Sequence, residues 1–198
     1  GLADWLQLEE LHQYPDLRIA ISEGSIGWVP YFMERADFSN WRHKAWTNSR
    51  FKDIKPSDLV KRHFLHCFID DRFGLRHLDE IGEDMVAYEC DYPHSDALWP
   101  DVPEYLWESV KHLTDGQIDK VTHGNALRFF RHDTLFGNYS REEITVGALR
   151  AKARAKGVDT APKSSAGSRP PADNRPVTSG DIMEMFKAHA AEREAEAV

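Results

Sequence analysis

Three short apolar segments, separated by helical patterns, most constrain how this chain can fold. Residues 17–21, 66–69 and 85–89 are mostly apolar, and each is short enough to favour a strand over a helix. A helical pattern starts at Pro30 and another near Ser57, between the first two segments. Strands that alternate with helices along a chain usually pair in parallel. The sequence therefore predicts an α/β fold with a parallel sheet.

The third segment leads into a run of residues that can carry chemistry. Asp91 follows the strand, Pro93 forbids further strand, and His94 comes next in the loop. Ligands of α/β folds bind at the carboxyl ends of the strands, and a carboxylate there needs a partner because its desolvation is costly. We expect Asp91 to be a site residue. The alternative is an aspartate that caps the following turn.

Side chains alternate between the two faces of a strand, so the orientation of the third strand can be predicted. If Asp91 points into the mouth of the fold, Glu89 and Ala87 point inward below it, and Tyr88 and Cys90 face the helices.

Two further residues are candidates for the same mouth. Glu23 follows the first strand and shares a face with Ile19 and Ile21, so we expect it to point inward as a general acid or base. The alternative is a structural glutamate that binds the amides of residues 24–27. His94 either bonds a substrate anion and orients Asp91, or is a loop histidine that faces solvent.

Several runs, in one order along the chain, resemble the amidohydrolase-related family, which includes metal-dependent TIM barrels similar to 2-amino-3-carboxymuconate semialdehyde decarboxylase. The matching runs are Tyr14-Pro15-Asp16-Leu17 to Ser22-Glu23-Gly24, Gly27-Trp28-Val29-Pro30-Tyr31 to Arg35, Cys67-Phe68-Ile69-Asp70-Asp71, Asp91-Tyr92-Pro93-His94-Ser95-Asp96 with Trp99-Pro100, and Gly124-Asn125-Ala126-Leu127-Arg128-Phe129-Phe130. In the family's order these are the sixth strand, the helix after it, the seventh strand, the last strand with its loop, and the closing helix.

The resemblance implies a fold, an activity and a cofactor. Residues 1–133 would form the C-terminal three strand–helix units of a TIM (β/α)8 barrel. Asp91 would bind a divalent metal, with zinc favoured over manganese, and Asp91, Glu23 and His94 would act through metal-activated water on a small carboxylated or cyclic substrate. The family's decarboxylases commonly hold a histidine where Glu23 stands, and a carboxylate there repels a carboxylate substrate. Non-oxidative decarboxylation is therefore the alternative to hydrolysis.

The same resemblance shows what the chain lacks. A barrel of this type needs roughly 250 residues, whereas the chain has 198 and contains no His-x-His, the metal-binding pair of the family's first strand. We expect the C-terminal portion of a longer enzyme, inactive and a weak metal binder in isolation, because a catalytic metal site usually has three protein ligands. The alternative is an inactive barrel fragment that acts as an assembly partner.

Composition limits the partners and the cellular compartment that we expect for this chain. The chain has 33 acidic against 25 basic residues, which disfavours nucleic acid and anionic membranes as partners, and it contains no apolar run long enough to span a bilayer. The two cysteines, Cys67 and Cys90, are both expected in buried strands, which favours a reduced, cytoplasmic protein. We expect a small molecule as the partner and leave a homo-oligomer open.

Several local features complete the expectations. Residues 38–55 are expected to be a long aromatic loop, Ser57 the N-cap of a helix, and Asp70 or Asp71 the cap of a helix running to Ile81.

Beyond residue 133 we expect three further regions. Residues 134–155 are expected to be a helical extension, and residues 156–180 a disordered linker rich in Pro, Ser and Gly. Ser179 is expected to cap a short amphipathic helix over residues 181–198, with Ile182, Met185, Phe186 and His189 on one face. This helix either docks into a hydrophobic groove or frays in solvent.

Overall fold

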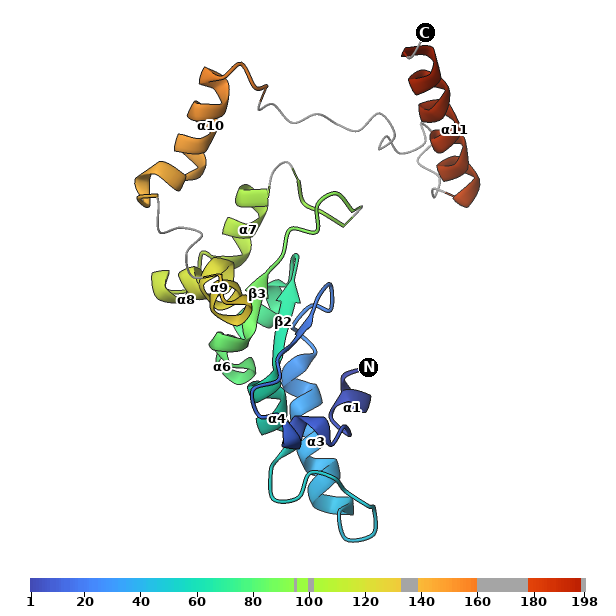
Figure 1. Cartoon of the computed structure of the whole chain (residues 1–198), viewed down its shortest axis with the longest axis vertical. Coiled ribbons are helices and arrows are strands. Elements are labelled where there is room, and N and C mark those ends of the chain that lie inside the picture. Colours follow the sequence, from blue (N-terminus) through green and yellow to red (C-terminus); the bar gives the residue numbers. More distant parts are fainter. Residues whose placement is uncertain (95, 100–101, 133–138, 160–177, 197–198) are drawn as a thin grey trace. The chain divides into compact units, whose positions relative to one another are not determined.

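The computed structural model divides the chain into two units, Gly1–Val158 and Asp159–Val198 (Figure 1). The structure describes residues 1–94, 96–99, 102–132, 139–159 and 178–196. Most of the predicted linker, residues 160–177, lies outside the described residues.

A parallel sheet forms the centre of the first unit. Its strands are β1 (Ile19–Ile21), β2 (Phe64–Phe68) and β3 (Val86–Tyr88), in the order β1-β2-β3. Ile19 pairs with Phe64, and His66 pairs with Val86. This pairing confirms the parallel α/β arrangement predicted from the alternating segments. Helices connect each pair of neighbouring strands, as parallel pairing requires.

Helices of the first unit connect the strands and follow them along the chain. They are α1 (Leu2–Trp5), α2 (Glu10–Gln13), α3 (Val29–His43), α4 (Pro56–His63), α5 (Arg72–Arg76), α6 (Leu78–Ile81), α7 (Val102–Val110), α8 (Asp115–Asp119), α9 (Asn125–Phe130) and α10 (Val146–Ala155). Short 3-10 turns lie at Glu83–Met85 and Glu142–Ile144, and a π-helical turn, Lys120–Gly124, joins α8 to α9.

Two predicted features of the β1–β2 connection are wrong. The helix α3 continues to His43, so the expected aromatic loop begins six residues later than predicted. Ser57 is not an N-cap, because Pro56 already occupies the first helical position and Lys55 is the capping residue. Ser57 instead donates its backbone N–H and its hydroxyl to Asp37 of α3, at 2.9 and 2.7 Å, and so ties α3 to α4.

The helix predicted to run from Asp70 or Asp71 to Ile81 is interrupted. It divides into α5 and α6 at His77, which has a non-helical backbone with φ −112° and ψ 24°. The cap itself is Asp71, whose side chain accepts the N–H of Gly74.

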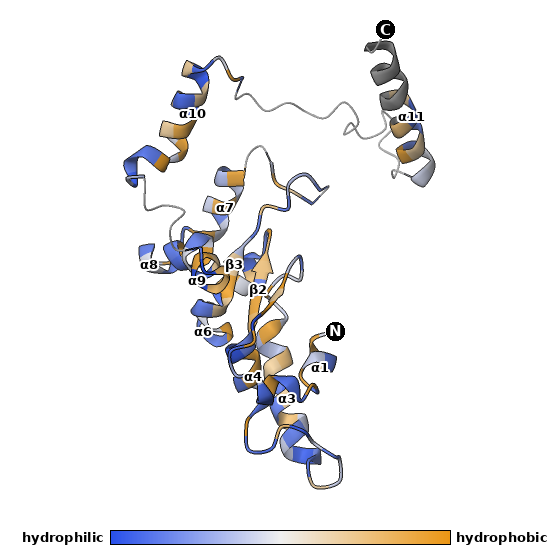
Figure 2. Cartoon of the chain, viewed as in Figure 1, coloured by the Kyte–Doolittle hydropathy of each residue, from blue (hydrophilic) through white to orange (hydrophobic). Residues whose placement is uncertain are grey.

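The two faces of the sheet pack differently. Phe64 and Phe68 of β2 are fully buried with Val86 on the side covered by α3 to α6, and Ile19 and Ile21 pack against this same cluster. A second, smaller cluster, on the opposite face, contains Leu65, Cys67 and Ala87, with Ala20, Ala126 and Phe129 packed against it. Burial of each large side chain stabilises the fold by about 1.5–3 kcal/mol. Strands buried on both faces need apolar side chains, and β2 and β3 are accordingly coloured mostly hydrophobic in Figure 2.

The second unit contains α11 (Ser179–Glu196). Thr178, and not the predicted Ser179, caps it: the Thr178 hydroxyl accepts the N–H of Asp181, whose carboxylate accepts the N–H of Thr178 at 2.8 Å. Ile182 and Phe186 are exposed on this helix, whereas the side chains of Met185 and His189 lie outside what the structure describes. Among the described residues, no helix is both long enough and apolar enough to cross a membrane.

Candidate functional site

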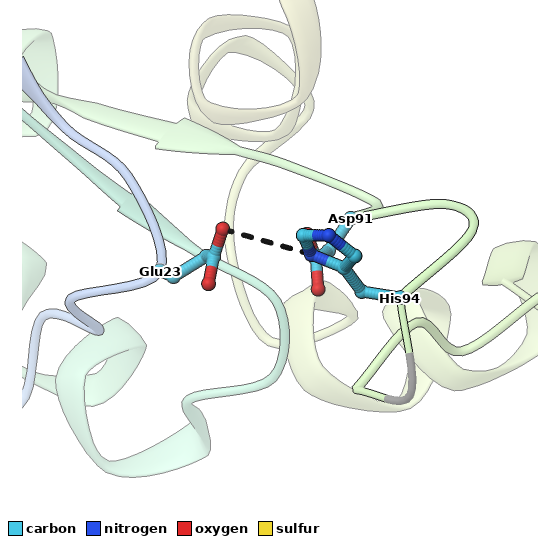
Figure 3. A group of neighbouring side chains, drawn as sticks. All are labelled: Glu23, Asp91 and His94. Atoms are coloured by element: carbon cyan, nitrogen blue, oxygen red, sulfur yellow. Dashed lines mark hydrogen bonds and ion pairs between the residues drawn. The ribbon is translucent and has the colours of Figure 1, made fainter.

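Three polar side chains from two strand ends converge at one edge of the sheet. Glu23 follows β1, whereas Asp91 and His94 follow β3 (Figure 3). One ligand atom of each residue lies within 4.8 Å of the other two. The structure therefore brings together the three residues that the sequence singled out.

Asp91 and His94 form the tighter pair of this group. His94 Nδ1 lies 2.9 Å from Asp91 Oδ1, and the His94 backbone N–H donates to the Asp91 carbonyl at 2.8 Å. The Asp91 side chain is only 10% exposed, whereas that of His94 is 67% exposed. Asp91 has a φ of 53°, in the left-handed region that aspartate tolerates better than most residues. His94 is thus an exposed histidine whose ring is oriented by a largely buried carboxylate.

The strand pattern did not predict the backbone conformation that places Glu23 in the site. Ile19 and Ile21 pack on the helix-covered side, so their alternation alone would turn Glu23 away from the mouth. The backbone of Glu23 instead adopts a φ of 56°, which breaks the strand alternation. Its carboxylate lies 3.9 Å from His94 Nδ1 and is 57% exposed.

Asp71 binds two of the amides in the loop after Glu23, so these two are not held by the Glu23 carboxylate. Asp71 Oδ2 accepts the N–H groups of Ile26 and Gly27 at 2.8 and 2.7 Å, and Oδ1 accepts the N–H of Gly74 at 2.8 Å. A Cβ atom on Gly27 would lie 3.1 Å from Asp71 Oδ1, so glycine permits this close approach. The sequence predicted Asp70 or Asp71 as a helix cap, and it did not indicate that Asp71 also holds this loop.

Glu89 connects the two strand ends of the site. It continues β3, and its carboxylate accepts the backbone N–H of Glu23. Its charge acts on Cys67, which belongs to the same cluster as Ala87, and this agrees with the prediction that Ala87 and Glu89 share a face.

The two cysteines differ in their surroundings. Burial, together with the nearby charge of Glu89, raises the pKa of Cys67 to about 11, so this thiol is neutral near pH 7 and is a poor nucleophile or ligand. Cys90 is exposed, contrary to the expectation that it lies in a buried strand, because β3 ends at Tyr88.

The donor set fits a divalent cation. Two carboxylates and an imidazole are ligands that zinc accepts at about 2.0–2.2 Å, which places tetrahedral ligand atoms about 3.4 Å apart. The observed spread of up to 4.8 Å requires some closure. Glu23 and His94 are exposed enough to supply it, while Asp91 stays fixed.

Solved structures share this fold. A 5-carboxyvanillate decarboxylase from Sphingomonas paucimobilis aligns with a TM-score of 0.54 and 19% identity, over 64% of this chain and 37% of that chain. An amidohydrolase from Mycobacterium avium subsp. paratuberculosis K-10 gives 0.52 and 18%, over 65% and 32%. A dihydroxybenzoic acid decarboxylase from Polaromonas sp. JS666, with bound manganese and the inhibitor 2-nitroresorcinol, gives 0.51 and 18%, over 70% and 41%.

These likenesses show the fold, and the chain spans only 32–41% of the length of these proteins. No curated protein sequence matches the chain. The family model described as amidohydrolase matches residues 8–132, which is more than half of the 198 residues. The chain therefore belongs to the amidohydrolase family.

Proposed function

We propose that this chain forms the last three strand–helix units of a metal-dependent amidohydrolase barrel and carries part of its active site. The complete enzyme would hydrolyse a small carboxylated or cyclic substrate. The observation that carries this proposal is the convergence of Glu23, Asp91 and His94, whose ligand atoms lie within 4.8 Å of one another at the carboxyl ends of β1 and β3.

Each residue has a role in this proposal that follows from its surroundings. Asp91 would hold the cation, because its carboxylate is largely buried and its charge is weakly screened there. A bound divalent cation supplies an acidified water and polarises a carbonyl oxygen. His94 presents Nδ1 to Asp91, which leaves Nε2 to exchange a proton or bond an anionic substrate. Glu23 would serve as the general acid or base, since its carboxylate is accessible and close to His94.

Non-oxidative decarboxylation is the second candidate. It is supported by the activities of two structural neighbours, which are decarboxylases of 5-carboxyvanillate and of dihydroxybenzoic acid. Glu23 argues against it, because a carboxylate at the mouth repels a substrate carboxylate unless one of the two is protonated or bound to metal.

The test compares two reactions of the Mn²⁺-loaded protein. Hydrolysis of cyclic amides and esters is followed by acid release, and decarboxylation of hydroxybenzoates by CO₂ release. Both assays are run on this chain alone and on a polypeptide that carries the remaining strands of the barrel. We expect hydrolysis only with the completed barrel, and we expect Asp91→Asn to abolish it without lowering the melting temperature. CO₂ release without hydrolysis would replace the first candidate by the second, and full turnover by Asp91→Asn would refute the site.

Glu23→Gln separates chemistry from structure. The amide keeps the shape but cannot transfer a proton, so we expect a large loss of kcat at an unchanged melting temperature. Glu34→Gln, an exposed residue of α3, is the matched control. A lowered melting temperature with normal kcat would show that Glu23 is only structural.

A further inference from the structure

Glu89 makes a contact that crosses the sheet at the mouth of the site. The strand order places β2 between β1 and β3, so the ends of β1 and β3 are not neighbours in the sheet. The Glu89 backbone N–H donates to Phe68 of β2 at 3.0 Å, and its side chain passes on to accept the backbone N–H of Glu23 beyond β1. One residue directly after β3 thus ties together all three strand ends.

The bound amide belongs to the residue whose conformation needs support. Glu23 has a φ of 56°, a strained region that residues with a Cβ seldom occupy. This conformation turns the Glu23 carboxylate toward His94, 3.9 Å away, although the side chain is 57% exposed. A hydrogen bond from an amide to a carboxylate is among the stronger kinds, which suits it to hold such a turn.

We propose that Glu89 is a positioning residue for the cation site: by accepting the Glu23 N–H, it holds the Glu23 carboxylate against Asp91 and His94. The role depends on the reach and acceptor oxygen of the side chain, not on its negative charge. Glu89 itself is not one of the three residues whose ligand atoms converge. This inference deepens the proposed function and rests on it for its metal-binding readout.

Two matched substitutions separate reach from charge. Glu89→Gln keeps the length and an acceptor oxygen but removes the charge. Glu89→Asp keeps the charge but is one methylene too short to make the same contact. Glu89→Ala removes both, and Glu10→Ala, an exposed residue of α2, is the control.

Two readouts are taken on the whole chain: the Mn²⁺ dissociation constant by calorimetry, and the ¹H shift of the Glu23 amide by NMR. We expect Glu89→Gln to keep the parent affinity and the low-field amide shift. Glu89→Asp and Glu89→Ala should weaken Mn²⁺ binding about 10- to 100-fold, the usual cost of losing a group that orients a ligand, and should move the amide upfield. The melting temperatures of Glu89→Gln and Glu89→Asp should agree.

Other patterns overturn the inference. Suppose that Glu89→Asp binds Mn²⁺ like the parent and that Glu89→Gln binds it as weakly as Glu89→Ala. Glu89 then supports the site through its charge and not through the hydrogen bond. Parent-like binding in all three variants would show that Glu89 positions nothing, and equal loss in all three would show that neither reach nor charge is the cause. Should Glu89→Ala fail to fold, the Gln and Asp variants still decide. If the parent binds Mn²⁺ too weakly to measure, as expected for this part of the barrel in isolation, the Glu23 amide shift decides the role of Glu89, and the turnover of the completed barrel decides the proposed function.

Discussion

A buried histidine makes the fold sensitive to acid. His66 lies on β2 with 1% of its surface exposed, and neither ring nitrogen has a hydrogen-bond partner among the residues that the structure describes. Its ring lies 6.0 Å from that of Trp28 in an edge-on arrangement and 6.5 Å from that of Phe64. Burial in these apolar surroundings lowers the pKa of His66 from 6.5 to about 4.

The sign and size of the effect follow from proton linkage. Above pH 6.5 the imidazole is neutral in both states and adds no pH dependence. As the pH falls from 6.5 to 4, the unfolded chain binds a proton that the folded chain does not, so stability is lost. The shift from 6.5 to about 4 corresponds to about 3 kcal/mol in total, of which about 2 kcal/mol is lost by pH 5.

The assay is urea unfolding at pH 7.5 and pH 5 for the parent, His66→Phe and His132→Phe, the last an exposed control. Burial also lowers the pKa of His63, so the parent has a second acid-sensitive group, but that group is the same in all three proteins. We expect His66→Phe to lose about 2 kcal/mol less than the parent between the two pH values, and His132→Phe to match the parent. An equal loss in His66→Phe and the parent would refute the reasoning.

Three further changes test contacts that hold the fold. Asp71→Ala removes three hydrogen bonds to backbone amides and should cost about 3 kcal/mol in urea unfolding. Gly74→Ala places a Cβ 2.3 Å from Ile26 Cγ1 and 2.8 Å from the Gly27 nitrogen, so the melting temperature should fall, whereas Gly116→Ala, in open space, should not lower it in this way. Asn125→Ala removes donors to Glu83 and Val86 at 2.7 and 2.8 Å and should cost about 2 kcal/mol, measured by chemical unfolding.

The strands were predictable because each is a short apolar run between helical patterns. The predicted segments overlap β1, β2 and β3, with boundaries that differ by one or two residues. The alternation of β3 also predicted correctly that Ala87 and Tyr88 lie on opposite faces of the sheet, with Tyr88 against the larger cluster. These features depend on residues close in sequence, for which a local pattern is sufficient.

The remaining features depend on contacts between distant segments. The strand alternation failed at Glu23, because its left-handed backbone is coupled to a carboxylate 66 residues away. Asp71 binds amides 44 and 45 residues earlier, and no local signal marks that role. The site residues themselves were found because each follows a strand end, but their mutual distances required the folded chain.

The central claim is that Asp91 holds a divalent cation beside Glu23 and His94. The direct measurement is anomalous diffraction from crystals of this chain soaked in millimolar Mn²⁺, a concentration that also fills a weak site. The account predicts an anomalous peak within coordination distance of the Asp91 carboxylate, flanked by Glu23 and His94, and its loss in Asp91→Asn crystals. Peaks found only elsewhere on the chain, or a peak at the site that persists in Asp91→Asn, would contradict it.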